Sequence, residues 1–296
     1  MEKTSKRGKS HFESFLKQAN GEPLPELMEK MSVRGKTNFT SFLKHISPRV
    51  LVKSRIQNRV GSSSSRAKAE GVRKPHIVLN DIWKAYNVWS CYTVGIPITL
   101  NWRSVNQYYA PTLSAIQIFT KKPLIDGSSS RSFAEDCHLY LEFNQTMRIE
   151  DRPPLIETVT NLAKKHHGLS SLKISDLSEN SWFAVSWSPS VQIPEVQVVK
   201  GYFITYHSFT PAFPATCPQE NKLKFELPAF GVVGSKLSNN VWIIPGTTDQ
   251  ENMNSLEESA ASWLGKVMFT HTDFDMFMAQ KKPNDLPSPS GVVTGE

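Results

Sequence analysis

The sequence predicts an α+β domain, built mainly on an antiparallel sheet with helices packed on one face. Three observations support this class: two strand-like segments face each other within residues 181–209, further strand-like runs are joined by short turns, and clear helical patterns occur at only three places between them. We expect one folded body over residues 76–278. A basic, largely disordered arm (1–75) precedes it and a disordered tail (279–296) follows it.

The span 181–209 contains the strongest strand signal. Residues 182–187 read WFAVSW, so aromatic side chains fall on both faces when successive residues alternate. Residues 202–209, YFITYHSF, have the same property. A strand with large apolar groups on both faces is buried on both sides, so we expect this pair at the centre of the sheet.

The arm contains an internal repeat. Residues 7–17 (RGKSHFESFLK) recur 27 positions later as residues 34–44 (RGKTNFTSFLK). Each copy places a Ser or Thr cap before Phe, Phe and Leu at helical spacing, which predicts a short amphipathic helix. One hypothesis is a pair of docking helices for a partner; the other is a segment duplication whose second copy packs on the body. The candidate partner-binding residues are Phe12, Phe15, Leu16, Phe39, Phe42 and Leu43.

Charge is concentrated in the arm. Residues 1–75 carry 17 Lys and Arg against 6 Asp and Glu, a net charge of +11, whereas the rest of the chain carries 17 against 21, a net charge of −4. Residues 47–74 are basic and Ser-rich, a composition typical of a flexible linker. We expect any nucleic-acid affinity to be weak and confined to this arm, because aromatic residues for base stacking are absent between Phe42 and Trp83.

The first half of the body has one helical and several extended patterns. Leu79, Ile82, Trp83, Tyr86 and Trp89 recur at helical spacing. Residues 93–100, 106–110 and 113–119 then look extended and together predict a β-meander, followed by a polar loop over 121–135. The alternation of Leu139, Leu141 and Phe143 favours another strand, with a short helix as the alternative.

The second half returns to helices around the central strand pair. Pro153 and Pro154 open a helix with an apolar stripe from Leu155 to Ala163. After the central pair, residues 230–237 and 241–244 flank Ser-Asn-Asn, a hairpin signature. The final helix has the clearest apolar stripe: Met253, Leu256, Ala260, Trp263, Leu264 and Val267.

Composition excludes several classes of protein. With 39% hydrophobic residues the chain can form a real core, so wholesale disorder is excluded. The three cysteines are far apart and odd in number, which argues against a disulfide framework and predicts an intracellular protein of the nucleus or cytoplasm. No apolar run approaches the roughly 18 residues that a membrane span needs.

Catalytic motifs are missing from the sequence. It contains no phosphate loop, dinucleotide fingerprint, HExxH or GxSxG. His207, within the apolar run TYHS, is the candidate functional polar residue, although a hydrogen-bonded structural histidine is the favoured interpretation. We interpret His271, Asp273 and Asp275 as exposed polar residues and helix caps rather than as a metal site. We therefore expect no cofactor and no metal.

The ordered motifs of the body resemble a known family. They include LNDIW (79–83), VGIPI (94–98), QYYAPTLSAIQI (107–118), RPPL (152–155), SWFAVSW (181–187), YHS (206–208) and HTDF (271–274). This series is similar to the plant family catalogued as domain of unknown function 789. The resemblance implies a plant origin but no activity and no catalytic residues. Members of that family commonly begin with one short helix of the Asn-Phe-x-x-Phe-Leu kind, so the doubled copy is a departure.

These observations together favour a non-catalytic domain that binds a protein partner and carries a basic regulatory or docking arm. The motivation is an aromatic-rich body without a recognisable catalytic constellation. The alternatives are an enzyme of unrecognised class that uses His207, and weak nucleic-acid binding through the arm.

Overall fold

The structure is a computed structural model of the whole chain. It describes residues 37–56, 73–100, 103–122, 132–134, 137–190, 201–209, 223–235, 241–243 and 247–281. The expected arm residues 1–36, the linker residues 57–72 and the tail residues 282–296 lie outside the described part. Among the described helices, none is both long enough and apolar enough to cross a membrane.

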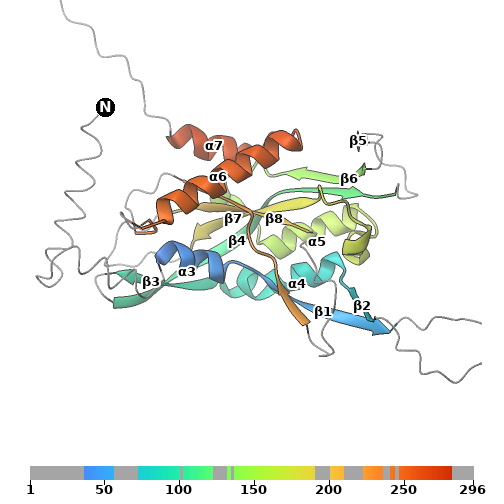
Figure 1. Cartoon of the computed structure of the whole chain (residues 1–296), viewed down its shortest axis with the longest axis horizontal. Helices are drawn as coiled ribbons and strands as arrows, with labels where there is room; N and C mark the ends of the chain where they lie inside the picture. Colours follow the sequence, from blue (N-terminus) through green and yellow to red (C-terminus); the bar gives the residue numbers. More distant parts are fainter. Residues whose placement is uncertain are drawn as a thin grey trace, which may run out of the picture.

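A large antiparallel sheet organises the fold (Figure 1). Its strands run in the order β10-β8-β7-β4-β6-β5, and β3 pairs with the first half of β4. The strands are β3 (Val94–Leu100), β4 (Arg103–Thr120), β5 (Ser132–Ala134), β6 (Cys137–Asn144), β7 (Trp182–Pro189), β8 (Phe203–Ser208) and β10 (Gly231–Gly234). The predicted α+β class and antiparallel sheet are confirmed.

The central strand pair is as predicted. β7 pairs antiparallel with β8, from Trp182 opposite Ser208 to Trp187 opposite Phe203, and both strands have a further neighbour on the other side. Phe183 and Trp187 join one core cluster, whereas Trp182 and Ala184 join another. Apolar side chains therefore anchor separate layers on the two faces of one strand.

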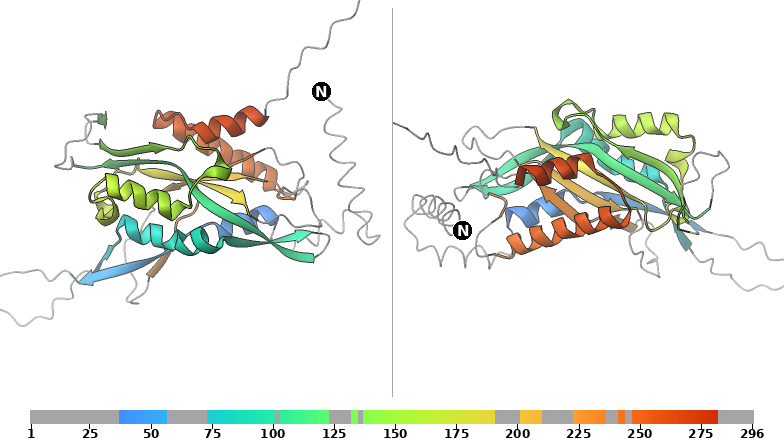
Figure 2. Two further views of the ribbon diagram at one scale, coloured as in Figure 1. Left: turned by 180° about the vertical axis from the view of Figure 1, so that it is seen from behind. Right: turned by 90° about the horizontal axis from the view of Figure 1, so that it is seen from above.

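Helices cover both faces of the sheet rather than the single face predicted. The face with Phe183 packs with α3 (Asn38–His45), α4 (Leu79–Tyr92) and α5 (Leu155–Lys165), and we call it the α4 face. The face with Trp182 packs with α6 (Asp249–Lys266) and α7 (Thr272–Lys281), and we call it the α7 face. Figure 2, right, shows α6 and α7 lying across their side of the sheet. Strands 182–187 and 203–207 carry apolar side chains on both faces, so each face needs its own cover of helices. The single-face prediction did not follow this pattern to its consequence.

The packed body begins before residue 76. Phe39 and Phe42 of α3 are fully buried, and α3 lies beside β3. The following segment, expected to be part of a flexible linker, contains β1 (Arg49–Ile56), which pairs with β2 (Arg73–His76) and β9 (Leu223–Glu226) in a three-stranded sheet. The basic composition of this segment suits an edge sheet as well as a linker, so composition alone could not distinguish the two.

Smaller differences concern the ends of elements. The predicted strand at 241–244 is a turn over 241–243, although its Trp242 is buried. The polar loop 121–135 includes β5, and α7 continues to Lys281 past the expected boundary at 278. In the final helix, Met253, Ala260, Leu264 and Val267 are buried as predicted, whereas Trp263 is half-buried against Phe230. Three short 3-10 turns complete the fold: η1 (Ile149–Asp151), η2 (Leu169–Ser171) and η3 (Ile174–Asp176).

The cover on the α7 face requires a glycine. A Cβ on Gly231 of β10 would lie 2.9 Å from Cβ of Ala260 and 3.1 Å from its backbone nitrogen. Contacts this short to helix backbone cannot be relieved by a side-chain rotation, so α6 lies this close to β10 only because residue 231 has no side chain.

Candidate functional site

Six polar side chains meet under α7, in what we call the polar cluster. They are Ser114 of β4, Arg152 after η1, Ser186 of β7, Tyr206 of β8, and His271 and Asp273 at the start of α7. All six residues are buried, and Ser114, Ser186, Tyr206, His271 and Asp273 are each 1% exposed or less. Segments up to 159 residues apart in the sequence thus contribute to one cluster.

Ser114 reaches the cluster because β4 has a bulge. Leu113 pairs with Val185 and Ala115 with Ala184, so Ser114 is an extra residue between consecutive partners on β7. A bulge of this kind re-aims a side chain that regular alternation would send elsewhere. The other two strand residues need no such device, because Ser186 and Tyr206 alternate with the residues of the α4 face.

Arg152 and Asp273 form a bidentate ion pair at the centre of the cluster. Nη1 and Nη2 of Arg152 each lie 2.6 Å from one oxygen of Asp273. Nε and Nη2 also donate to the carbonyl of Met147, and Nη1 donates to Ser186 Oγ at 3.2 Å. The guanidinium therefore uses all five of its N–H donors inside the protein. Both side chains are only 2% exposed, so each charge depends on the other for compensation.

The Asp273 carboxylate is held in its charged form. Burial raises its pKa, but the hydrogen bonds and charge of Arg152, with help from Ser114 and His271, outweigh burial, and the net pKa lies below its usual value. Ser114 Oγ and Ser186 Oγ also donate to Oδ2 of this carboxylate, Ser186 at 2.9 Å. Asp273 is thus an acceptor for two hydroxyls as well as for Arg152.

These bonds fix the direction of the hydrogen bonds of His271. A carboxylate only accepts, so Ser114 spends its single hydroxyl proton on Asp273. The nitrogen Nε2 of His271, 2.8 Å from Ser114 Oγ, must then donate to Ser114, and Nδ1 must accept from the Tyr206 hydroxyl at 2.8 Å. Burial lowers the pKa of His271 to about 4, with Asp273 opposing and Arg152 adding to this shift, so the ring is neutral at pH 7.

Ser114, His271 and Asp273 have the residue types of a hydrolytic triad but not its arrangement. In a triad the histidine accepts the serine proton, and the carboxylate accepts from the other ring nitrogen. Here the serine donates to the carboxylate, and Tyr206 takes the place of the carboxylate at Nδ1. The nucleophile is also fully buried. The arrangement stabilises a charge pair rather than activating Ser114.

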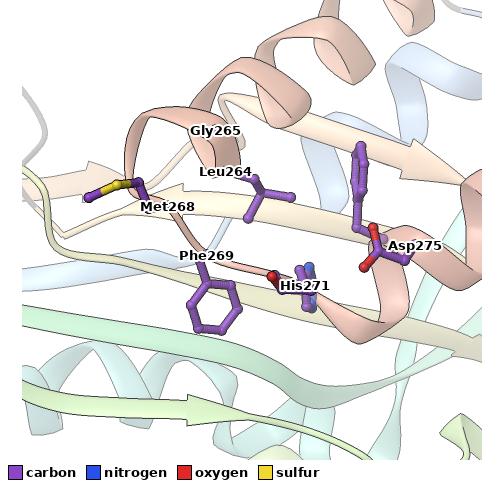
Figure 3. Close-up of a pocket in the computed structure, with 8 residues that line it drawn as sticks. Leu264, Gly265, Met268, Phe269, His271 and Asp275 are labelled. Carbon is purple, nitrogen blue, oxygen red and sulfur yellow. The ribbon is translucent and has the colours of Figure 1, made fainter.

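A shallow, open pocket of about 400 Å³ lies beside the cluster, at the turn between α6 and α7 (Figure 3). Its lining residues are Leu264, Gly265, Met268, Phe269, Thr270, His271, Phe274 and Asp275. Met268 is 79% exposed and has a φ of 49°, a left-handed backbone conformation that is uncommon for a residue with a side chain. The pocket therefore combines an exposed apolar side chain with one carboxylate, Asp275.

His207, the candidate polar residue from the sequence, lies on the opposite face of the sheet. Its Nδ1 donates to the carbonyl of Leu227 at 3.0 Å, and its Nε2 accepts from Thr205 Oγ1 at 2.9 Å. Thr205 in turn accepts from Trp187 Nε1, and the imidazole stacks on Phe183. Burial lowers the pKa of His207 to about 4. Both ring nitrogens are engaged, so this histidine has the contacts of a structural residue.

The other predicted residues divide between described and undescribed segments. Phe39 and Phe42 are buried in the core and Leu43 is half-buried against it, so α3 uses its apolar stripe to pack on this body. Phe12, Phe15 and Leu16 lie outside the described residues. Within the described ranges, no group of three or more His, Cys, Asp or Glu side chains is arranged to hold a metal ion.

The interpretation of His271 and Asp273 as surface residues is wrong, because both are buried, whereas Asp275 is exposed as expected. The sequence reasoning also missed Ser114, Arg152, Ser186 and Tyr206. One signal was present: Ser186 stands at a core-facing position within the otherwise apolar run WFAVSW, and the neighbouring strand FITYHS carries several polar side chains in a buried segment. Buried polar groups require partners, which predicts a polar contact across the sheet but not the segments that supply it.

Comparison with known proteins places the chain in a family. A family model described as "Protein of unknown function (DUF789)" matches residues 37–135 and 125–277. Searches of curated proteins and of solved structures found no match. The matched region starts at Thr37, the N-cap of α3, and covers every segment of the polar cluster. The chain therefore belongs to the DUF789 family of proteins of unknown function.

Proposed function

We propose that this protein is a non-catalytic intracellular domain, of the nucleus or cytoplasm, that binds a protein partner at the turn between α6 and α7. The observation that carries the proposal is Met268: it is 79% exposed, its backbone is left-handed, and it borders the apolar pocket. The left-handed backbone belongs to the C-terminal cap of α6, in which the Met268 N–H donates to the Gly265 carbonyl and the Phe269 N–H to the Leu264 carbonyl, so the turn presents Met268 in a fixed position. Exposed methionines suit binding surfaces because their flexible thioether adapts to different partners.

The chemistry of the pocket indicates what the partner presents. Leu264, Phe269 and Phe274 offer apolar walls, which suit one aliphatic or aromatic side chain. Asp275 is exposed at the same place and favours a neighbouring Lys or Arg on the partner. We therefore expect a partner segment with an apolar anchor next to a basic residue.

The polar cluster supports the non-catalytic part of the proposal. Its serine, histidine and carboxylate are engaged with one another, with Arg152 and with Tyr206, and they are shielded from solvent. A catalytic group has to reach its substrate, either directly or through one water. The cluster instead ties α7 to three strands, which holds the neighbouring turn and its pocket in place.

Substitution at Met268 tests this function. Full-length wild-type protein, Met268→Glu and Tyr92→Glu are used as baits in native tissue extract, and the recovered partner is then purified and its affinity measured. Tyr92 is the matched control, because it is 80% exposed but lies at the end of α4. We expect Met268→Glu to weaken binding by at least about tenfold, or about 1.4 kcal/mol, and Tyr92→Glu to leave it unchanged. Equal affinity for all three proteins contradicts the proposed site.

An enzyme is the second candidate, and one observation favours it: Ser114 lies 2.8 Å from a histidine nitrogen. A fluorophosphonate probe separates the two functions, because it labels serines that are activated as nucleophiles. We expect no labelling of Ser114 in the native protein. Labelling that is lost in Ser114→Ala and in His271→Gln would support a hydrolase and contradict the non-catalytic proposal.

A further inference from the structure

The position that α3 occupies on the body is highly specific. Asn38 donates to the carbonyls of Thr99 and Val241 at 3.1 and 2.7 Å and accepts from the Thr99 amide at 2.7 Å. Ser41 donates to the carbonyl of Pro97 at 2.8 Å. Thr37, the N-cap, donates to Asp249 at 2.6 Å. We call the surface that receives these contacts the α3 docking site.

Aromatic contacts complete the α3 docking site. The ring of Phe42 lies with its centroid 4.2 Å from that of Phe203, 5.7 Å from Tyr109 and 5.6 Å from Trp242. Phe39 is also fully buried. The site therefore recognises a short helix that carries two phenylalanines three residues apart, a hydroxyl cap before them and a serine between them.

The first copy of the repeat meets each of these requirements. Ser10 corresponds to the cap Thr37, Ser14 to Ser41, and Phe12, Phe15 and Leu16 to Phe39, Phe42 and Leu43. Glu13 replaces Thr40 and gives the S-x-x-E spacing of a capping box, which favours the helix. This copy precedes Thr37, the residue at which the family match begins, and so lies outside the matched region.

One difference explains why α3 rather than the first copy occupies the site. His11 stands where the second copy has Asn38. Asn38 makes three hydrogen bonds at once, two as donor and one as acceptor. A neutral imidazole has one N–H and one acceptor nitrogen, and its ring is bulkier than an amide. The first copy is thus a weaker ligand for the same surface.

We propose that residues 10–16 are a second, tethered occupant of the α3 docking site, which bind there when α3 leaves it. The two copies are 27 residues apart, so the chain after the first copy has about thirty residues with which to return to β1. The entropy of closing such a loop grows only slowly with its length, and the tether keeps the local concentration in the millimolar range. Exchange releases Phe39, Phe42 and Leu43 while the aromatic core stays covered.

A double-mutant cycle in the full-length chain tests the exchange. Phe39→Ala with Phe42→Ala disables α3, and Phe12→Ala with Phe15→Ala disables the first copy. We expect the first-copy variant alone to keep the wild-type Tm, and the α3 variant to lower it. The variant with all four substitutions should melt below the α3 variant by about 5 °C or more. Equal Tm values for the α3 variant and the four-substitution variant overturn the proposal.

A milder variant covers the case in which loss of both phenylalanines prevents folding. Asn38→Ala removes the three hydrogen bonds to Thr99 and Val241 and leaves the aromatic contacts. Asn38→Ala should lower the Tm more in the chain with Phe12→Ala and Phe15→Ala than in the wild-type chain. An equal decrease in the two chains overturns the proposal.

Two further measurements identify the occupant. A synthetic peptide of residues 7–18 should raise the Tm of the four-substitution variant with increasing concentration, whereas the same peptide with Phe12→Ala and Phe15→Ala should not. No rescue by the natural peptide contradicts the fit to the site. The Tm of the α3 variant should not depend on protein concentration, because the occupant is in the same chain. A Tm that rises with protein concentration overturns the same-chain assignment and indicates exchange between two copies.

Discussion

The two faces of the central sheet each bury a histidine, and the surroundings of the two residues differ. His207, on the α4 face, contacts a threonine hydroxyl and a backbone carbonyl, all neutral groups. His271, on the α7 face, is one step from the Arg152–Asp273 ion pair through Ser114. Burial lowers the pKa of each to about 4. The same titration behaviour therefore arises in one neutral and one charged environment.

The stability of the α7 face is the more sensitive to the loss of a single polar contact. On the α4 face, removing a neutral partner leaves a buried polar group without a hydrogen bond. On the α7 face, removing one member of the ion pair leaves a buried charge without compensation. The α4 face is covered by three helices and a large aromatic core, while the α7 face relies on two helices and the polar cluster. We expect the polar cluster to determine whether α7 stays on the sheet.

The largest effect is expected from Asp273→Asn. The substitution leaves the Arg152 guanidinium, 2% exposed, without a counter-charge. Breaking a buried pair in this way costs about 3–5 kcal/mol. Denaturant unfolding measures the loss. The control is Asp275→Asn, which changes the same residue type on the same helix at an exposed position, and should cost about 0.5 kcal/mol or less. Equal costs for the two variants would mean that the ion pair does not stabilise α7.

The next largest effect is expected from low pH, which should lower the free energy of unfolding through the buried histidine on each face. A histidine whose folded pKa is depressed to about 4 stays neutral while the unfolded histidine protonates near pH 6.5. Stability is therefore complete above pH 6.5 and is lost as the pH falls towards 4, by about 2 kcal/mol for each histidine at pH 5. Asp273, with its lowered pKa, adds a further loss only below the usual range of a carboxyl.

Unfolding at pH 7.5 and at pH 5.0 measures this loss. His207→Gln and His271→Gln should each remove about half of the difference in unfolding free energy between the two pH values. A difference that both variants leave unchanged would show that other groups cause the acid sensitivity.

Thr205→Val should have a smaller effect on the α4 face. It removes the hydroxyl that accepts from Trp187 Nε1 and donates to His207 Nε2, while the shape of the side chain is nearly kept. Two buried polar groups lose a partner; each loss costs about 1–3 kcal/mol, and because both groups are neutral we expect the lower end, a total of about 2–3 kcal/mol. The cost comes from denaturant unfolding at pH 7.5. If Thr205→Val were as costly as Asp273→Asn, the two faces would not differ in the way proposed.

The smallest expected effect is the coupling energy between a substitution on one face and a substitution on the other. Thr205 and Asp273 share no hydrogen-bond partner, and they lie on opposite faces of the sheet. The unfolding free energies of Thr205→Val and Asp273→Asn should therefore add to within about 0.5 kcal/mol in the double variant. A larger coupling energy would indicate that the sheet transmits strain from one face to the other.

Local patterns in the sequence were enough for most of the elements. The alternation in 182–187 and 203–208 predicted the central strand pair and the residues on each face, and the stripe from Met253 to Val267 predicted α6. The pair of prolines before Leu155 predicted the start of α5. These predictions hold because helix and strand periods are properties of neighbouring residues.

Local patterns did not indicate which segments pack against one another; long-range contacts set those pairings. The second repeat copy and the basic segment at 49–56 belong to the body because β3, Trp242 and β9 receive them, and no local pattern encodes those partners. The polar cluster likewise depends on long-range packing: a bulge in β4 turns Ser114 towards α7, and Arg152 and Asp273 come from two other distant segments. The sequence alone determined α4, α5, α6 and the central strand pair, together with their apolar faces. Burial of polar and charged groups was decided by long-range packing, because a charge is stable inside a protein only when its partner arrives from elsewhere in the chain.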